Sequence, residues 1–325
     1  MDLVQPYLIF LPPALARRAL ETLDQTDSPF ADMSELVRVS LENLFALNGV
    51  KLKPAPGAAS TELGNWTLND LLKVPSGLDF ETVNSQQLDE RLFVLTNRLN
   101  PIPLMTRILL NMIAKDEAPD INQFVETAGK CARELGHRLR QDDEHVNRGA
   151  LDKRSIGWPV GPEANKSLRR FTVSFLLSAN HRGPTGPLVY LGLVGVVENR
   201  ILPTALGVNL ARAPSSLMGE TEGGSCSAEQ QSLLCQAIRG MPEEFAAVKH
   251  FAEAVRNANG HQPAVDRRLS LHHKNWSPNL VAAHRAAMVG RLRDLGLLEV
   301  TGRGTKAVMT ITLEGDRFIN DAQEA

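Results

Sequence analysis

The stretch SPNLVAAHRAAMVGRLRDLGLLEVTGRGTKAVMTITLEGDRFI, residues 277–319, determines what fold the C-terminal third of the chain can adopt. Ser277 and Pro278 are typical of the cap and the first position of a helix. The apolar side chains that follow recur at spacings of seven, four and three, which places them on one helical face. They are Val281, Met288, Leu292 and Leu295.

A tight turn and a hairpin are expected directly after this helix. Gly296 lies in the sequence Leu295-Gly296-Leu297-Leu298 and marks the turn. Two strand-like runs then flank Gly302-Arg303-Gly304, and the closing residues are predicted to form a short final helix.

The order of these elements resembles a winged-helix domain of the bacterial regulator type. The residues that carry the resemblance are Leu295-Gly296-Leu297-Leu298, the basic wing Thr301 to Lys306, Thr312-Leu313-Glu314-Gly315, and Phe318. The resemblance implies that the helix enters the major groove of DNA and that the wing contacts phosphate or the minor groove.

Local charge agrees with this implication, although the whole chain is nearly neutral, with 35 basic and 37 acidic residues. Residues 261–306 hold eight basic side chains against three acidic ones, a net charge of +5. We therefore predict contact with double-stranded DNA, mainly through its phosphates. The predicted contact residues are Arg267, Arg268, Lys274, Asn279, Arg285, Arg293, Arg303 and Lys306.

The face of the predicted recognition helix opposite its apolar stripe consists largely of small residues. It carries Asn279, Ala282, Ala283, Ala286, Gly290 and Arg293. Only Asn279 and Arg293 in this set are of residue types that can make the bidentate base contacts by which a protein discriminates DNA sequence. Such a face also suits a closely docked protein, so a scaffold subunit of a multiprotein assembly is the alternative hypothesis.

The fold class predicted for the whole chain is mainly α with short β-hairpin wings, arranged as tandem winged-helix-type domains after a small strand-helix-helix segment. Stretches rich in Pro, Gly, Ser and Ala indicate linkers. The predicted domains are 1–48, a linker 49–65, a helical domain 66–212, a linker 213–227, and a C-terminal domain 228–325.

The middle domain repeats the pattern of the C-terminus. Leu191-Gly192-Leu193-Val194 precedes a tight hairpin at Glu198-Asn199-Arg200, which resembles a second winged helix with a short wing. Helical spacing further predicts helices over 84–98, 101–115, 120–141 and 164–179. Residues 130–170 carry a net charge of +4, which a solvated helical surface also explains.

The N-terminal segment, residues 6–47, resembles the ribbon-helix-helix fold of small dimeric repressors. Its strand departs from that family because Pro6, Leu8 and Phe10 stand where polar base-reading side chains are expected. Residues 1–100 also carry a net charge of −5. We therefore expect self-association or docking on a partner protein through Tyr7, Leu8, Ile9, Phe10 and Leu11.

The sequence contains no phosphate-loop, dinucleotide, nucleophile-elbow or zincin motif, so we expect neither an enzyme nor a cofactor. Asp142-Asp143-Glu144 with His145 is the one acidic cluster considered for a metal, and a solvated helix end explains it better. His272-His273 has no evident third ligand in the sequence. We predict no metal site.

Three cysteines, Cys131, Cys226 and Cys235, have neither a CxxC pair nor metal spacing, which favours reduced thiols in a cytoplasmic protein. The longest apolar stretch, Leu188 to Val197, is half the length of a membrane helix and contains two glycines. No membrane association is expected.

Overall fold

A computed structural model describes most of the chain after residue 66. The described residues are 67–76, 79–84, 92, 96–115, 118–150, 152–161, 164–176, 178–180, 183–222, 224–302 and 306–320. All of them belong to one compact unit, Leu63–Ala325. Helices predominate over short antiparallel strand pairs, so the predicted mainly α class is confirmed. Residues 1–48 and the predicted linker 49–65 lie outside this description.

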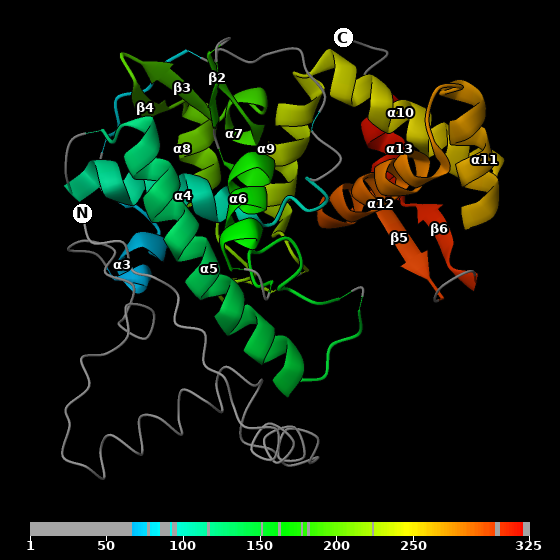
Figure 1. Cartoon of the computed structure of the whole chain (residues 1–325), viewed down its shortest axis with the longest axis horizontal. Helices are drawn as coiled ribbons and strands as arrows, with labels where there is room; N and C mark the ends of the chain where they lie inside the picture. The colour runs from blue at the N-terminus through cyan, green and yellow to red at the C-terminus, as the bar shows by residue number, and fades with distance from the viewer. Residues whose placement is uncertain are drawn as a thin grey trace, which may run out of the picture. The chain divides into compact units, whose positions relative to one another are not determined.

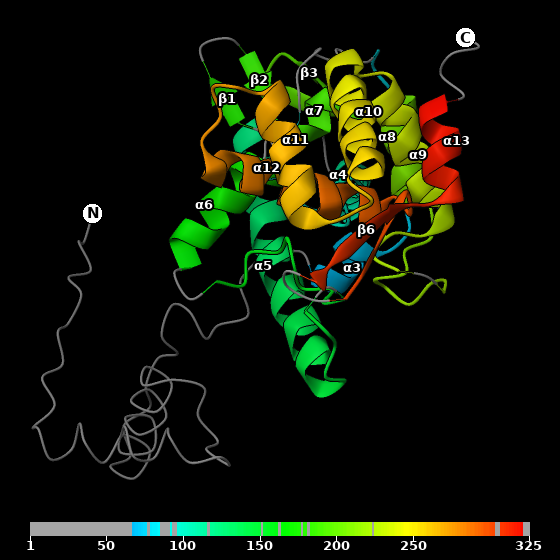
Figure 2. The same cartoon turned by 90° about the vertical axis from the view of Figure 1, so that its right-hand side faces the viewer.

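Residues 228–320 form what we call the C-terminal module (Figure 1). Figure 2 shows α10, α11 and α12 packed together beside the β5–β6 hairpin. The elements of this module are α9 Ala228–Arg239, α10 Pro242–Asn257, α11 Gln262–His272, α12 Pro278–Asp294, β5 Leu298–Thr301, β6 Val308–Ile311 and α13 Leu313–Asn320.

Helix α12 begins and ends where the sequence predicts. The Ser277 hydroxyl accepts a hydrogen bond from the Leu280 amide at 3.3 Å, and Pro278 occupies the first turn. The predicted apolar stripe is buried throughout: Val281, Met288, Leu292 and Leu295 are each at most 3% exposed.

The loop between α10 and α11 contacts the β5–β6 hairpin through an isolated β-bridge. Leu298 pairs with Ile311 and Thr301 with Val308 within the hairpin. On the other side of β6, His261 forms a bridge to Val308, and the Met309 amide donates to the Gly260 carbonyl at 3.0 Å. The β6 edge of the hairpin is thus anchored to the loop between α10 and α11.

Residues 101–212 form what we call the middle module, and α3 Leu68–Leu72 packs against it. Its elements are α4 Pro101–Lys115, α5 Ile121–His145, α6 Ala164–Phe175, β1 Ser178–Asn180, β2 Gly183–Thr185, α7 Pro187–Tyr190, β3 Val194–Val197, β4 Arg200–Pro203 and α8 Ala205–Arg212.

The same backbone and threonine hydrogen bonds surround the β3–β4 hairpin of the middle module and the β5–β6 hairpin of the C-terminal module. Thr204 follows β4 and donates its amide to the Leu193 carbonyl at 3.0 Å, just as Thr312 follows β6 and donates to the Leu297 carbonyl at 3.1 Å. The threonine hydroxyls donate to Gly192 and Gly296 carbonyls at 2.7 and 2.8 Å. The edge bridge recurs as well, because Asp120 pairs with Arg200 as His261 pairs with Val308.

Glycine is required at one position of this repeat because backbone approaches backbone there. Gly207 and Gly315 donate their amides to the preceding threonine hydroxyls at 3.1 and 3.0 Å. A Cβ atom at these positions would lie 2.0 Å from the Leu193 carbonyl oxygen and 2.3 Å from that of Leu297. Any side chain here forces the helix away from the hairpin.

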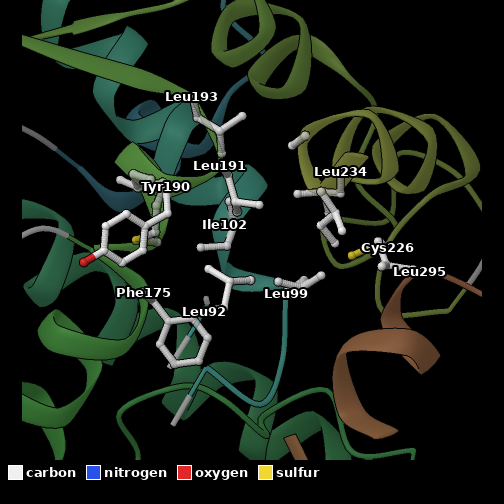
Figure 3. Packing of buried hydrophobic residues seen from close by; sticks show 14 of the residues in the cluster. Leu92, Leu99, Ile102, Phe175, Tyr190, Leu191, Leu193, Cys226, Leu234 and Leu295 are labelled. Carbon is white, nitrogen blue, oxygen red and sulfur yellow. The ribbon is translucent and has the colours of Figure 1, made fainter. Parts of the chain in front are cut away.

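The hydrophobic core runs without a break from the middle module into the C-terminal module. In Figure 3, Leu99 and Ile102 lie between Tyr190 and Leu191 on one side and Leu234 on the other. Leu295, at the end of α12, belongs to the same cluster. The modules therefore share buried apolar surface.

The predicted helix 84–98 is wrong at the residues that the structure describes. Residues 84, 92 and 96–98 are not helical. Tertiary hydrogen bonds replace helical ones here: the Leu92 amide donates to Glu244 at 3.1 Å, and the Thr96 hydroxyl donates to the Ser174 carbonyl at 2.6 Å. Differences in helix propensity are small in free energy, so tertiary contacts of this kind override them.

The stretch 213–227, predicted to be a linker, packs against α4. Arg107 of α4 is fully buried and donates to the Ala211 and Ala213 carbonyls and to both carboxylate oxygens of Glu220. It also donates to the Leu72 carbonyl at 3.0 Å. One guanidinium thus ties α3, α4, α8 and this stretch together.

Candidate nucleic-acid interface

The two halves of α12 have different surroundings. Asn279, Leu280, Ala283 and Ala286 in the N-terminal half are exposed. Toward its C-terminal end, a Cβ at Gly290 would lie 2.0 Å from the Asn97 carbonyl oxygen, so an extended segment covers this part of the helix. Only the N-terminal half is open to a large partner.

Buried charges hold the C-terminal half of α12 in place. Asp294 accepts from the Arg98 Nε at 2.9 Å and from the Leu99 and Asn100 amides at 2.6 and 3.2 Å. Arg291 lies 3.4 Å from Glu244 of α10, and burial lowers the pKa of this guanidinium while Glu244 opposes the shift. This half of α12 is a structural element of the core.

Two of the predicted DNA-contacting arginines are paired with acids. Arg285 donates to Asp266 of α11 at 2.7 Å, and Arg293 donates to Asp152 at 3.1 Å. Both arginines line a groove of about 480 Å³ between the hairpin base and residues 149–152. A phosphate at Arg293 would therefore lie beside the Asp152 carboxylate and be repelled by it.

The remaining described candidates are exposed. Arg267 and Arg268 lie on α11, Lys274 lies in the turn between α11 and α12, and Lys306 lies at the base of the wing. Asn279 is exposed on the first turn of α12. Arg303 and the association residues Tyr7, Leu8, Ile9, Phe10 and Leu11 lie outside the described residues.

The middle module does not present its equivalent of α12. Helix α7 has only four residues, and all of them are buried. The hairpin loop consists of Glu198 and Asn199, both with positive φ, and is too short to extend as a wing. Exposed Lys166, Arg169 and Arg170 lie on α6 instead.

Asp143, from the acidic cluster considered for a metal, is engaged in the fold. Its carboxylate is 1% exposed and accepts from the Arg154 amide at 2.9 Å, the Ser155 amide at 2.8 Å and the Arg148 guanidinium at 3.1 Å. Burial alone would raise the pKa of Asp143, but these hydrogen bonds outweigh it and lower the pKa. The carboxylate anchors the loop after α5.

A cluster of histidines is the feature that sequence reasoning missed. His250 of α10 lies beside His272 and His273 at the end of α11, and their ligand atoms all lie within 4.8 Å of one another. His250 is 22 residues away from His272 in the sequence. No local spacing indicates the contact, because only the packing of α10 on α11 brings the third ring to the pair.

The cysteines are unpaired and poorly reactive. Burial raises the pKa of Cys131 and of Cys235 to about 12. The pKa of the fully buried Cys226 is also raised well above its ordinary value, first by burial and then by the nearby Asp294. Thiolate chemistry at neutral pH is thereby disfavoured at all three.

No family model matches the chain, and no curated protein and no solved structure shows significant similarity to it. Among the described helices, none is both long enough and apolar enough to cross a bilayer.

Proposed function

We propose that the protein is a non-enzymatic, cytoplasmic DNA-binding protein that contacts duplex DNA mainly through phosphates. The C-terminal module supplies the contact surface, which consists of the N-terminal half of α12, the exposed residues of α11 and the hairpin. Association with another copy or with a partner protein involves residues 1–48.

The observation that carries this proposal is the order and pairing of the C-terminal elements. Helix α10, the β-bridge at His261, helices α11 and α12, the β5–β6 hairpin and α13 follow one another in the order of a winged-helix domain. In such domains the N-terminal residues of the second helix of the helix-turn-helix contact base edges. That is the half of α12 that remains exposed.

The distribution of free charge supports phosphate contact over base reading. Arg267 and Arg268 on α11, Lys274 in the turn before α12, and Lys306 before β6 are all exposed. Asn279 is the only exposed residue in the first half of that helix suited to a bidentate base contact. A mostly sequence-independent affinity with a strong salt dependence follows.

Single alanine substitutions test the wing directly. Lys306→Ala and Arg303→Ala should each lower the slope of log K against log salt concentration by about 1, because each removes about one phosphate contact. The measurement is a fluorescence-anisotropy titration of a labelled duplex at several salt concentrations.

The matched control is Lys130→Ala, which removes one lysine from α5, outside the C-terminal module. It should leave the slope unchanged. Unaltered slopes for both wing variants would remove the wing from the contact surface.

The alternative function is a scaffold subunit whose winged-helix modules bind protein. A specific observation favours it: Leu271 is 74% exposed and Leu280 is 37% exposed on the two helices of the helix-turn-helix. The small exposed residues Ala283 and Ala286 fit close docking.

Mass measurement by size-exclusion chromatography with light scattering separates the two functions. The full chain is compared with a chain that lacks residues 1–48. Monomers in both cases together with duplex binding contradict the scaffold, whereas an oligomer without duplex binding contradicts DNA contact.

A further inference from the structure

Three imidazole rings from two helices meet beside the turn between α11 and α12. His250 lies in the third turn of α10, His272 ends α11, and His273 is the residue that caps it. The His250 and His272 ring centroids are 3.7 Å apart, and those of His272 and His273 are 4.7 Å apart. None of this cluster is used in the proposed DNA contact.

The end of α11 explains how two consecutive histidines face the same point. Adjacent side chains on a continuous helix diverge by about 100°. His273, with φ −110° and ψ 68°, has left the helical path. Its ring is therefore turned so that both imidazoles lie near His250, with the His250 and His273 centroids 5.9 Å apart.

We propose that His250, His272 and His273 bind one divalent transition-metal ion, with zinc the best match. Imidazole nitrogen is a preferred ligand of zinc, whereas calcium and magnesium require oxygen ligands. The three ligand atoms lie within 4.8 Å of one another. A tetrahedral site with Zn–N bonds of 2.0–2.1 Å places its nitrogens roughly 3.4 Å apart. The His250 and His272 rings, which are stacked at an interplanar angle of 30°, must therefore rotate out of the stack so that their nitrogens converge on one ion.

The surroundings suit a three-histidine site with one position left to water. His272 is exposed and gives the ion a path from solvent, while His250 and His273 are half-buried and fix the inner side. Trp276 stacks on His273 with centroids 3.7 Å apart and an interplanar angle of 7°. This stacking restricts the orientation of the His273 ring and so holds its nitrogens close to the other two histidines.

The bound ion connects α10 to the turn that precedes α12. Lys274 follows His273 directly, and α12 begins at Pro278. A metal bridge at this point restrains the turn and stabilises the folded module by binding it and not the unfolded chain. The metal site rests on the histidine geometry and stands independently of DNA binding.

The test uses the full chain, without an affinity tag, after treatment with a chelator. Isothermal titration calorimetry with ZnCl₂ should give one ion per chain. Thermal unfolding should show a higher Tm with ZnCl₂ than without it. Titration with CoCl₂ should give the visible absorption of tetrahedral Co²⁺ without the charge-transfer band of a thiolate ligand. His272→Ala, at an exposed position that should not impair folding, should lower zinc affinity at least about tenfold, and His250→Ala should do the same.

The matched control is His261→Ala, which removes an exposed histidine of the same module that is not part of the cluster. It should bind zinc as the original chain does. The proposal is overturned by an absence of stoichiometric zinc binding, by equal zinc affinities of the His272→Ala and His261→Ala chains, or by a thiolate band with cobalt.

Discussion

At the scale of single residues, buried charge does structural work in this protein. Asp294 and Asp143 are each 1% exposed, and each accepts hydrogen bonds from two backbone amides and an arginine. Neither role is readable from the sequence, because their partners are loop amides whose positions depend on tertiary packing. In the sequence Asp143 is one of three consecutive acidic residues, whereas in the fold its carboxylate holds the loop after α5.

The lowered pKa of Asp143 predicts a pH-dependent contribution to stability. A carboxyl whose pKa is lower in the folded state stabilises the fold above its unfolded pKa of about 3.9, and the contribution disappears as pH falls through the folded pKa. Asp143→Asn should lower the free energy of unfolding by about 1.5–3 kcal/mol at pH 7. The difference from the original chain should shrink as the pH is lowered below 4.

Urea denaturation followed by circular dichroism at pH 7 and at acid pH measures this difference. Glu144→Gln is the control, since the exposed Glu144 carboxylate pairs with the exposed Arg140 on the same helix. A difference for Asp143→Asn that stays constant across pH would contradict the role of the ionised carboxylate.

At the scale of elements, the sequence predicted those whose apolar spacing is regular. Helices α4 and α12 and the strands β3 to β6 lie where expected. Helix α11 was missed because only Val265 and Leu269 are buried in its 11 residues, which leaves little periodicity to detect. The predicted helix 84–98 fails for the opposite reason: its apolar periodicity is outweighed by hydrogen bonds of Arg98 to Asp294 in α12 and of Leu92 to Glu244 in α10.

Gly207 and Gly315, three residues after Thr204 and Thr312, allow a direct test of how closely helix and hairpin pack. Gly315→Ala and Gly207→Ala should each destabilise the protein by about 2–3 kcal/mol, because the new Cβ overlaps a backbone carbonyl oxygen. Thermal unfolding checks this.

Gly224→Ala is the control, because a Cβ there has no neighbour within 4 Å. Similar unfolding temperatures for Gly315→Ala and Gly224→Ala would refute the close contact of helix and hairpin.

At the scale of the whole described unit, the recurrence of Leu-Gly-Leu predicted two hairpins, and the structure has both. The unequal exposure of the two modules could not be predicted from this recurrence, because it depends on the length of the helix before Leu-Gly-Leu. Helix α12 has 17 residues, whereas α7 has four. The middle module contributes to the shared core, and the C-terminal module retains an exposed half-helix. This asymmetry is why we assign DNA contact to the C-terminal module.

The most direct test of this assignment is a salt-dependent titration of a random-sequence duplex with the full chain and with a chain in which Arg267, Arg268, Lys274 and Lys306 are all alanine. The account predicts that the original chain binds and that the fourfold variant loses roughly 3–4 units of the salt slope, about 0.9 for each lost phosphate contact. Equal slopes and affinities for the two chains, or no duplex binding by the original chain at low salt, would contradict it.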